Sequence, residues 1–409
     1  MKIRRFAVVL CVLAFIAGAC GSSSKKSASG GTTTTAAGGS SSSCKATTGI
    51  KIVGLAETTG EGAQAVPYFA NGWQLGVDAV NAAGGICGQQ ISYERLPMSP
   101  TDNAQAKNTL LSALDKKADV LLGIVNSATV VALAPNVTQA ATPTIAFSSV
   151  ASAFLGAPNS VGSQWLFMIR PRNTTVTTAQ IDYLVKTLGK KKIGLQCVNQ
   201  TFGVQSCAAA KAAIEADGGT VVDQETNEVT DTNLTSKVLA LKNKGADGIY
   251  AAVFPNNGVV FFNELADNDV NVPVFSGAIA GLAMGTGQIK PAAVKNLYGL
   301  DDCAPAVESR ASKFNTAYRA KFGKAPSYSA AQAYDAIFIV KKVAEAAGGY
   351  DKAKIAAELA KLDYDGACTH YQADKGNGLA HSAVLETFAT DGTPTVVKSV
   401  DIPPPANGG

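Results

Sequence analysis

Short apolar runs alternate with helical patterns along most of the chain. Residues 50–55 are a nearly continuous apolar run, and residues 90–98 are consistent with a second strand. Between them, apolar side chains recur at the spacing of one helix face, at Phe69, Trp73, Val77 and Val80. Gly84-Gly85 follows, and glycine is the usual residue past a helix C-terminus. Because strands joined through a helix run parallel, residues 49–98 predict a strand–helix–strand unit of an α/β domain.

The same alternation continues in two series. Short, almost entirely apolar strands are predicted over 119–125, 143–148 and 165–170, and then over 192–198, 219–225, 248–254, 272–277 and 295–300. Helices are predicted between them, over 102–117, 127–140, 174–189, 203–217, 232–244 and 257–267. Strands of this composition are typical of parallel sheets buried on both faces, and two such series indicate two domains.

The remaining residues are less regular. Helices are predicted over 306–322, 328–347 and 352–362, the first with Pro305 directly before its start. Residues 385–388 and 395–400 are predicted to pair as strands around Asp391-Gly392, and residues 403–409 are predicted to form a loose tail.

The N-terminus has the pattern of an export signal. Residues 1–19 combine a basic start with an apolar core over 6–16, which is shorter than the roughly 20 apolar residues needed to span a bilayer. Residues 16–20, IAGAC, resemble the bacterial lipobox, in which Cys20 would carry the lipid; the alternative is an ordinary cleavage site with a chance cysteine. Residues 20–47 would then be the anchored cysteine and a flexible Gly/Ser/Thr linker. The sequence predicts an extracytoplasmic protein of the bacterial envelope, attached to the membrane by lipid alone.

Charge and motifs exclude several classes of function. The formal charge of +4 falls to about +1 without the three signal-peptide cations, and no basic stripe suggests a nucleic-acid partner. No G-x-S-x-G elbow, Walker loop or zincin helix is present, and the two histidines are His370 and His381. We therefore predict no catalytic residues, no metal and no cofactor.

Six cysteines remain for disulfides once Cys11 in the signal and Cys20 are set aside. Cys44 and Cys87 flank the first strand and helix at the same end, which favours Cys44–Cys87. Cys197 and Cys207 flank one strand-to-helix loop, which favours Cys197–Cys207. Cys303–Cys368 then follows by elimination.

Three segments resemble a known family. Residues 72–86 with 88–92, residues 168–172 (MIRPR) and residues 328–337 (YSAAQAYDAI) are similar to motifs of the branched-chain amino-acid (Leu/Ile/Val) binding proteins, the type I substrate-binding proteins of ABC importers. The resemblance implies two doubly wound, parallel-sheet α/β lobes joined by a hinge of three crossings. Lobe 1 would comprise 48–170 plus 304–347, and lobe 2 would comprise 171–303 plus 348–402.

Ligands of such sheets bind at the carboxyl ends of the strands, here between the lobes. In lobe 1, the loops at 126–129 and 148–152 begin helices, whose N-H groups suit a carboxylate; their Ser and Thr residues are otherwise plain helix caps. The resemblance implies lobe 1 contacts at Ser127, Ala128, Ser148, Ser149 and Val150.

In lobe 2, the resemblance places Phe202 and Phe254 where the family carries aromatic residues at the cleft; the alternative is ordinary core phenylalanine. Amino-acid binders of the family also carry an acid after a later strand, but this sequence has Phe275-Ser-Gly-Ala-Ile279 there. Since an unpaired buried ammonium is costly, an α-amino acid is disfavoured as the ligand. Glu57 or Glu61 could replace the acid, because the loop from Glu57 to Tyr68 is expected at the cleft end; otherwise Glu57 is a solvated loop acid. Glu57 and Tyr68 are therefore predicted as ligand contacts.

The resemblance implies a monomeric, non-enzymatic receptor that closes about its hinge around a small polar or carboxylate-bearing solute and delivers it to ABC permease subunits. The sequence favours an apolar or aromatic carboxylate or an amide over an amino acid. A sensor subunit for a membrane signalling partner is the first alternative. A secreted hydrolase that uses Ser148 or Ser149 with a histidine is a remote one.

Overall fold

The first sheet is parallel throughout. The computed structural model describes residues 44–58, 65–100, 102–149 and 164–404 of the chain. Its first sheet has the strand order β2-β1-β3-β4-β5. The strands are β1 (Lys51–Glu57), β2 (Ser92–Met98), β3 (Val120–Gly123), β4 (Thr144–Ala146) and β5 (Leu166–Met168). The order reverses at β1, so the loops after β1 and β3 meet at one edge of the sheet, where ligands of such folds bind.

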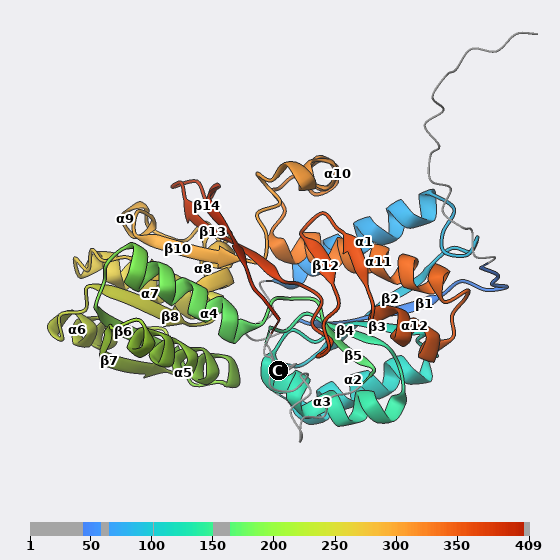
Figure 1. Ribbon diagram of the computed structural model, residues 1–409, viewed down its shortest axis with the longest axis horizontal. Helices are drawn as coiled ribbons and strands as arrows, with labels where there is room; N and C mark the ends of the chain where they lie inside the picture. Colours follow the sequence, from blue (N-terminus) through green and yellow to red (C-terminus); the bar gives the residue numbers. More distant parts are fainter. Residues whose placement is uncertain (1–43, 59–64, 101, 150–163, 405–409) are drawn as a thin grey trace, which may run out of the picture. The chain divides into compact units, whose positions relative to one another are not determined.

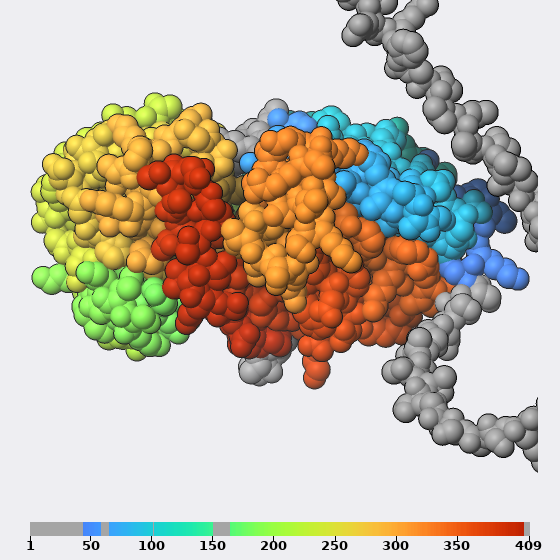
Figure 2. Space-filling model, turned by 90° about the horizontal axis from the view of Figure 1, so that it is seen from above, coloured from blue at the N-terminus to red at the C-terminus, as the bar shows by residue number. Residues whose placement is uncertain are grey.

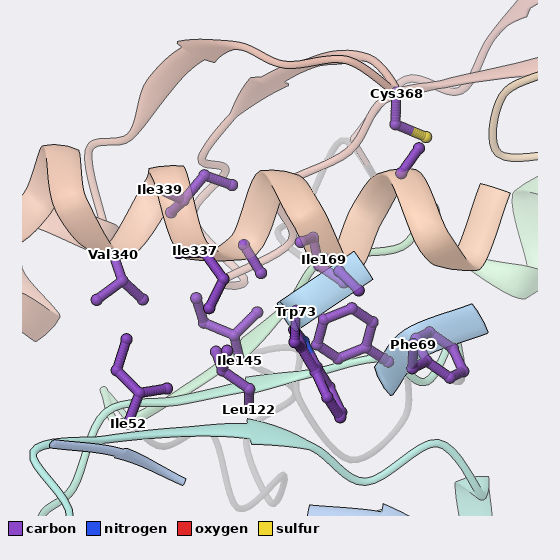
Figure 3. Close-up of a cluster of buried hydrophobic side chains, with 14 of the residues drawn as sticks. Ile52, Phe69, Trp73, Leu122, Ile145, Ile169, Ile337, Ile339, Val340 and Cys368 are labelled. Atoms are coloured by element: carbon purple, nitrogen blue, oxygen red, sulfur yellow. The ribbon is translucent and has the colours of Figure 1, made fainter. Parts of the chain in front are cut away.

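Two pairs of helices cover this sheet (Figure 1). Helices α1 (Val66–Ala82) and α11 (Tyr328–Ala346) pack on one face, and α2 (Asn103–Asp115) and α3 (Ser127–Ala140) pack on the other. Figure 3 shows Ile337 and Val340 of α11 facing Ile52 of β1 and Trp73 of α1. These side chains are at most 1% exposed. The α1 stripe that the sequence predicted therefore forms the centre of the first core.

The second sheet is mainly parallel and has an antiparallel edge. Its order is β14-β13-β10-β9-β8-β6-β7, and β13 runs antiparallel to both β10 and β14. The strands are β6 (Lys192–Val198), β7 (Thr220–Asn227), β8 (Gly248–Ala252), β9 (Val274–Phe275), β10 (Leu297–Asp301), β13 (Ser382–Phe388) and β14 (Pro394–Asp401). The predicted C-terminal strand pair is thus present and extends this sheet.

Helices again cover both faces. One core contains side chains of α4 (Asn173–Asp182), its π-helical extension Tyr183–Thr187 and α5 (Thr201–Ala216). The other contains side chains of α6 (Thr235–Asn243), α7 (Pro255–Asp267), α8 (Gly277–Met284) and α9 (Pro291–Val294). Two doubly wound α/β lobes are confirmed, each with a mainly parallel sheet. Every helix among the described residues is too short or too polar to cross a bilayer.

Three chain segments connect the lobes, and ion pairs tie them together. The first crossing follows β5, the second follows β10 and the third leads into β13. Arg170 of the first crossing donates to Asp302 of the second through Nε at 2.6 Å and Nη2 at 3.1 Å. Arg172 pairs with Asp374, which precedes the third crossing, at 2.5 and 3.1 Å. Burial alone would raise the pKa of Asp374, but the hydrogen bonds and charge of Arg172 outweigh it and lower that pKa.

The three predicted disulfides are present. Cys44–Cys87, Cys197–Cys207 and Cys303–Cys368 join Cα atoms that lie 5.1, 6.2 and 5.3 Å apart. Cys303 follows β10, so its disulfide attaches the second crossing to the loop between β11 (Asp363–Asp365) and β12 (His370–Gln372). Cys20 lies outside the described residues.

Several predicted elements differ from the structure. Residues 306–322 are not one helix: a short 3₁₀ turn at Ser309–Ala311 leads into α10 (Ser312–Phe322), so Pro305 does not begin a helix. Helix α8 was not predicted. Side chains of α12 (Lys352–Leu359) and of the β11–β12 hairpin pack in the core around α1 and α11. Part of the segment 348–402 that the sequence assigned to lobe 2 therefore packs with lobe 1, and the third crossing comes later in the chain.

Candidate functional site

A cavity of about 580 Å³ is lined by loops at the carboxyl ends of strands from both sheets, and we call it the cleft. Glu57, Ser127 and Ser149 contribute from the first lobe. Phe202, Phe254 and Ile279 contribute from the second. Its wall is therefore polar on one side and apolar on the other, an arrangement suited to a small ligand with one polar end.

Glu57 is the last residue of β1, and its side chain is fully buried. Its Oε1 accepts hydrogen bonds from the backbone N-H groups of Val125, at 2.9 Å, and Asn126, at 2.7 Å. The interpretation of Glu57 as a solvated loop acid was wrong, because the strand is longer than predicted and its last side chain points into the lobe. Glu57 fixes the loop after β3 while lining the cleft.

Asn126 caps α3, and its side chain accepts from two of the backbone N-H groups that the sequence predicted for a ligand carboxylate. Its Oδ1 accepts from the N-H groups of Ala128, at 2.9 Å, and Thr129, at 3.2 Å. The N-H of Ala128 is thus occupied within the protein. The hydroxyl of Ser127 lies 3.3 Å from that of Ser148, in hydrogen-bond contact.

The predicted first-lobe residues separate into three groups. Ser127 and Ser149 line the cleft, whereas Ala128 and Ser148 do not belong to its wall. Val150 and Glu61 lie outside the described residues. Of the predicted first-lobe contacts that the structure describes, Ser127 and Ser149 are therefore the two at the cleft wall, where a ligand carboxylate could accept hydrogen bonds.

Phe202 and Phe254 form one aromatic surface. Their ring centroids lie 5.8 Å apart with an interplanar angle of 28°, and both side chains are half-buried and line the cleft. Phe202 lies in the first turn of α5, and Phe254 immediately precedes α7, where Pro255 begins the helix. The alternative that they are ordinary core residues does not agree with this position.

Arg170 is a cleft residue that the sequence reasoning did not single out. Its guanidinium lies 4.7 Å from the ring centroid of Tyr328, and both residues line the cleft. Asp302, which also accepts from Gln332 Nε2 at 2.8 Å, holds two of its donors. A guanidinium carries five N-H donors, so the ion pair with Asp302 holds a cation at the cleft wall and uses only two of its donors. Residues 168–172 had been recognised only as a crossover motif.

Comparison with known proteins shows which family has this architecture. The periplasmic binding protein family matches residues 49–392, most of the chain. The chain belongs to the periplasmic binding protein family. A curated relative from Brucella abortus, named Leu/Ile/Val-binding protein homolog 8, is 29% identical over 279 residues; the match covers 63% of this chain and 66%, just under two thirds, of that protein.

Solved structures with the same fold include two with bound ligands. The branched-chain amino acid transporter substrate-binding protein LivJ from Streptococcus pneumoniae, in complex with isoleucine, has a TM-score of 0.77 at 23% identity, covering 87% of this chain and 99% of that one. An ABC-transporter solute-binding protein from R. palustris, in complex with benzoate, has a TM-score of 0.77 at 18% identity, covering 87% and 97%. The fold is therefore shared with binding proteins for chemically different solutes.

In this periplasmic binding protein, neutral groups occupy the position after β9 where the resemblance places an acid. Ser276 donates to Ala251 O at 2.7 Å, and the N-H of Gly277 donates to Gln180 Oε1 at 2.7 Å. Both residues line a second hollow of about 430 Å³ that shares Ser149, Arg170 and Phe202 with the cleft. The acid of that hollow is Asp302, which is paired with Arg170.

Tyr68 was predicted to contact the ligand in the cleft, but it does not belong to the cleft wall. It lines a separate cavity of about 570 Å³, and Lys324 Nζ lies 4.1 Å from its ring centroid. Tyr68 is in the first turn of α1, which points its side chain toward α8 and the segment before α11.

Proposed function

We propose that the protein is an extracytoplasmic solute receptor that serves an ABC importer, tethered to the membrane through a lipidated Cys20. The observation that carries the proposal is the cleft itself, with Ser127 and Arg170 on one side and the Phe202–Phe254 surface on the other. The relatives named above are solute-binding proteins or homologues of them, which supports this assignment.

The charge distribution favours a ligand with a carboxylate and without an ammonium group. Of the acids that face the cleft or the adjoining hollow, Glu57 accepts two backbone N-H groups and Asp302 is paired with Arg170. No further carboxylate is among the described residues that line these two hollows. An ammonium placed here would compete for carboxylates that already have partners. A carboxylate meets the Ser127 hydroxyl and the remaining donors of Arg170.

Binding would act through hinge closure. A solute anchored to first-lobe groups gains contact with Phe202 and Phe254 only when both lobes approach it, so the solute shifts the population toward a closed form. That closed form would be the one that the permease recognises. Adding the correct solute is therefore expected to reduce the radius of gyration in small-angle scattering.

A thermal-shift screen tests the assignment. Benzoate and short aliphatic acids are compared with neutral amides and amino acids; a ligand at about 100 times its Kd adds roughly 2.7 kcal/mol to the free energy of unfolding. The best ligand is then titrated into Phe202→Ala, where we expect weaker binding. Val204→Ala is the matched control, because Val204 lies on the same helix and is 56% exposed. Equal losses in both variants, or no stabilising solute of any class, would contradict the proposal.

A further inference from the structure

The cavity that contains Tyr68 is distinct from the cleft, although Leu282 and Tyr328 line both. Its walls come from residues 304–306 and 325–328, and from α8 with the β13–β14 hairpin. Figure 2 shows this face of the molecule, with β13–β14 in red beside the orange residues of α10.

Two buried acids face this cavity from adjacent strands. Asp301 of β10 pairs in register with Val384 of β13, so Glu386, two residues along, faces the same side of the sheet. Asp301 is 6% exposed and Glu386 is 1% exposed. Gly281 of α8 makes room for them: a Cβ built there would lie 2.5 Å from Asp301 Oδ2 and 3.4 Å from Glu386 Oε1, so the two carboxyl groups lie close together. Two buried carboxyl groups at such close range share one proton, because both cannot be ionised at once.

Two buried polar atoms at this cavity have no hydrogen-bond partner among the described residues. Asp301 Oδ1 is buried and accepts no hydrogen bond from any described residue. The hydroxyl of Ser327 is in the same situation, because Ser327 precedes α11 without capping it. Buried polar atoms of this kind are rare and costly, and two of them line one cavity. Such atoms suit a molecule that donates several hydrogen bonds.

The remaining lining favours a positive charge on that molecule. The aromatic residues Tyr68, Tyr328 and Phe388 line the cavity, and aromatic rings attract cations. Two nearby charged groups have other partners: Arg170 pairs with Asp302, and Glu308 accepts the N-H of Ala304 at 2.6 Å. Lys324 lies over the Tyr68 ring, which leaves Tyr328 and Phe388 as the rings for an added cation. Among the described residues no three metal-ligating side chains gather, so an organic cation fits better than a metal ion.

We propose that this cavity binds the primary ammonium group of a small organic amine, with Asp301 and Glu386 as its anionic partners and Ser327 as a further acceptor. The ammonium takes the place of the shared proton, which is released to solvent. The site is separate from the cleft, so the amine would be a different molecule from the solute that the cleft carries.

Isothermal titration calorimetry with n-butylammonium chloride tests the proposal, with 1-butanol as the neutral probe of similar size. At constant ionic strength we expect saturable binding of n-butylammonium at about pH 8 and weaker binding at about pH 5.5, because the shared proton must leave. Asp301→Asn and Glu386→Gln are each expected to weaken binding roughly tenfold or more. Glu215→Gln, an exposed acid on α5, is the control that leaves it unchanged.

Ser327→Ala provides a milder variant that keeps both acids, should a change at the pair disturb folding. It is expected to weaken n-butylammonium binding while far-ultraviolet circular dichroism stays the same. Three results would each overturn the proposal: no saturable binding at about pH 8, an equal response to 1-butanol, or unchanged affinity in the Asp301, Glu386 and Ser327 variants together.

Discussion

Glu57 combines two tasks at the cleft, because it holds the loop after β3 through two backbone N-H groups and also faces the ligand space. Replacing Glu57 with Gln keeps a side-chain oxygen for the two donors but removes the charge. For a ligand that carries a carboxylate, we expect Glu57→Gln to retain or improve affinity, since a like charge is removed.

Glu57→Ala is the matched comparison. It leaves the N-H groups of Val125 and Asn126 without this acceptor, and an unsatisfied buried donor costs about 1–3 kcal/mol, so we expect a lower thermal midpoint. Calorimetric titration and thermal unfolding measure the two effects separately. A more than roughly tenfold loss of carboxylate affinity in well-folded Glu57→Gln would instead indicate that Glu57 pairs with a ligand ammonium.

At the residue level, the sequence predicted part of the cleft. Ser127, Ser149, Phe202 and Phe254 lie in the loops or first helix turns that follow strands, so chain order places them at the sheet edge, but the family resemblance singled them out as ligand contacts. Arg170 was missed because its partner, Asp302, is far away in the sequence and belongs to a different crossing. Only the three-dimensional path of the hinge brings them together.

Helices α1 and α11 approach each other closely at glycine. A Cβ at Gly72 would lie 2.2 Å from the carbonyl oxygen of Ala330, which is backbone of α11 and cannot move aside cheaply. We therefore expect Gly72→Ala to destabilise the protein by roughly 1–3 kcal/mol, as overpacked cores do. Denaturant unfolding measures the change. Gln74→Ala, an exposed position of the same helix, is the control, and equal stability of the two variants would contradict this packing.

Helices and strands were predicted correctly where the hydrophobic period was regular, and they were missed where the sequence shows no clear period. The α1 stripe and the short apolar strands were found because each buries a regular face. Helix α8 was missed because GAIAGLAM is apolar all round and follows the two-residue strand β9, so neither period stands out. The 3₁₀ turn before α10 was missed because Pro305 is compatible with either a turn or a helix start.

The whole molecule should respond to pH through its buried acids. Burial raises the pKa of Glu386 to about 7 and, together with the charge of Glu386, raises that of Asp301 well above its usual value. Burial also raises the pKa of Asp335, on α11, to about 7. Acids with raised pKa values stabilise the fold below their unfolded values and lose that contribution as pH rises through the folded ones.

We therefore expect the thermal midpoint to fall between about pH 5 and about pH 8 in the absence of ligands. Glu386→Gln should flatten part of this decline, because the pair then no longer has to hold two charges. Glu215→Gln, at an exposed position of α5, should leave the decline unchanged. A midpoint that rises over this range, or the same slope in Glu386→Gln, would contradict the assignment of the shared proton.

We propose that the cleft holds a carboxylate without an accompanying ammonium. The most direct measurement is calorimetric titration with matched pairs that differ only in the amino group: leucine against 4-methylpentanoate, and phenylalanine against 3-phenylpropanoate. We predict that at least one amine-free acid binds more tightly than its amino-acid counterpart, and that Phe202→Ala weakens that binding. Tighter binding of leucine or phenylalanine than of the matched acid would contradict an amine-free carboxylate as the ligand.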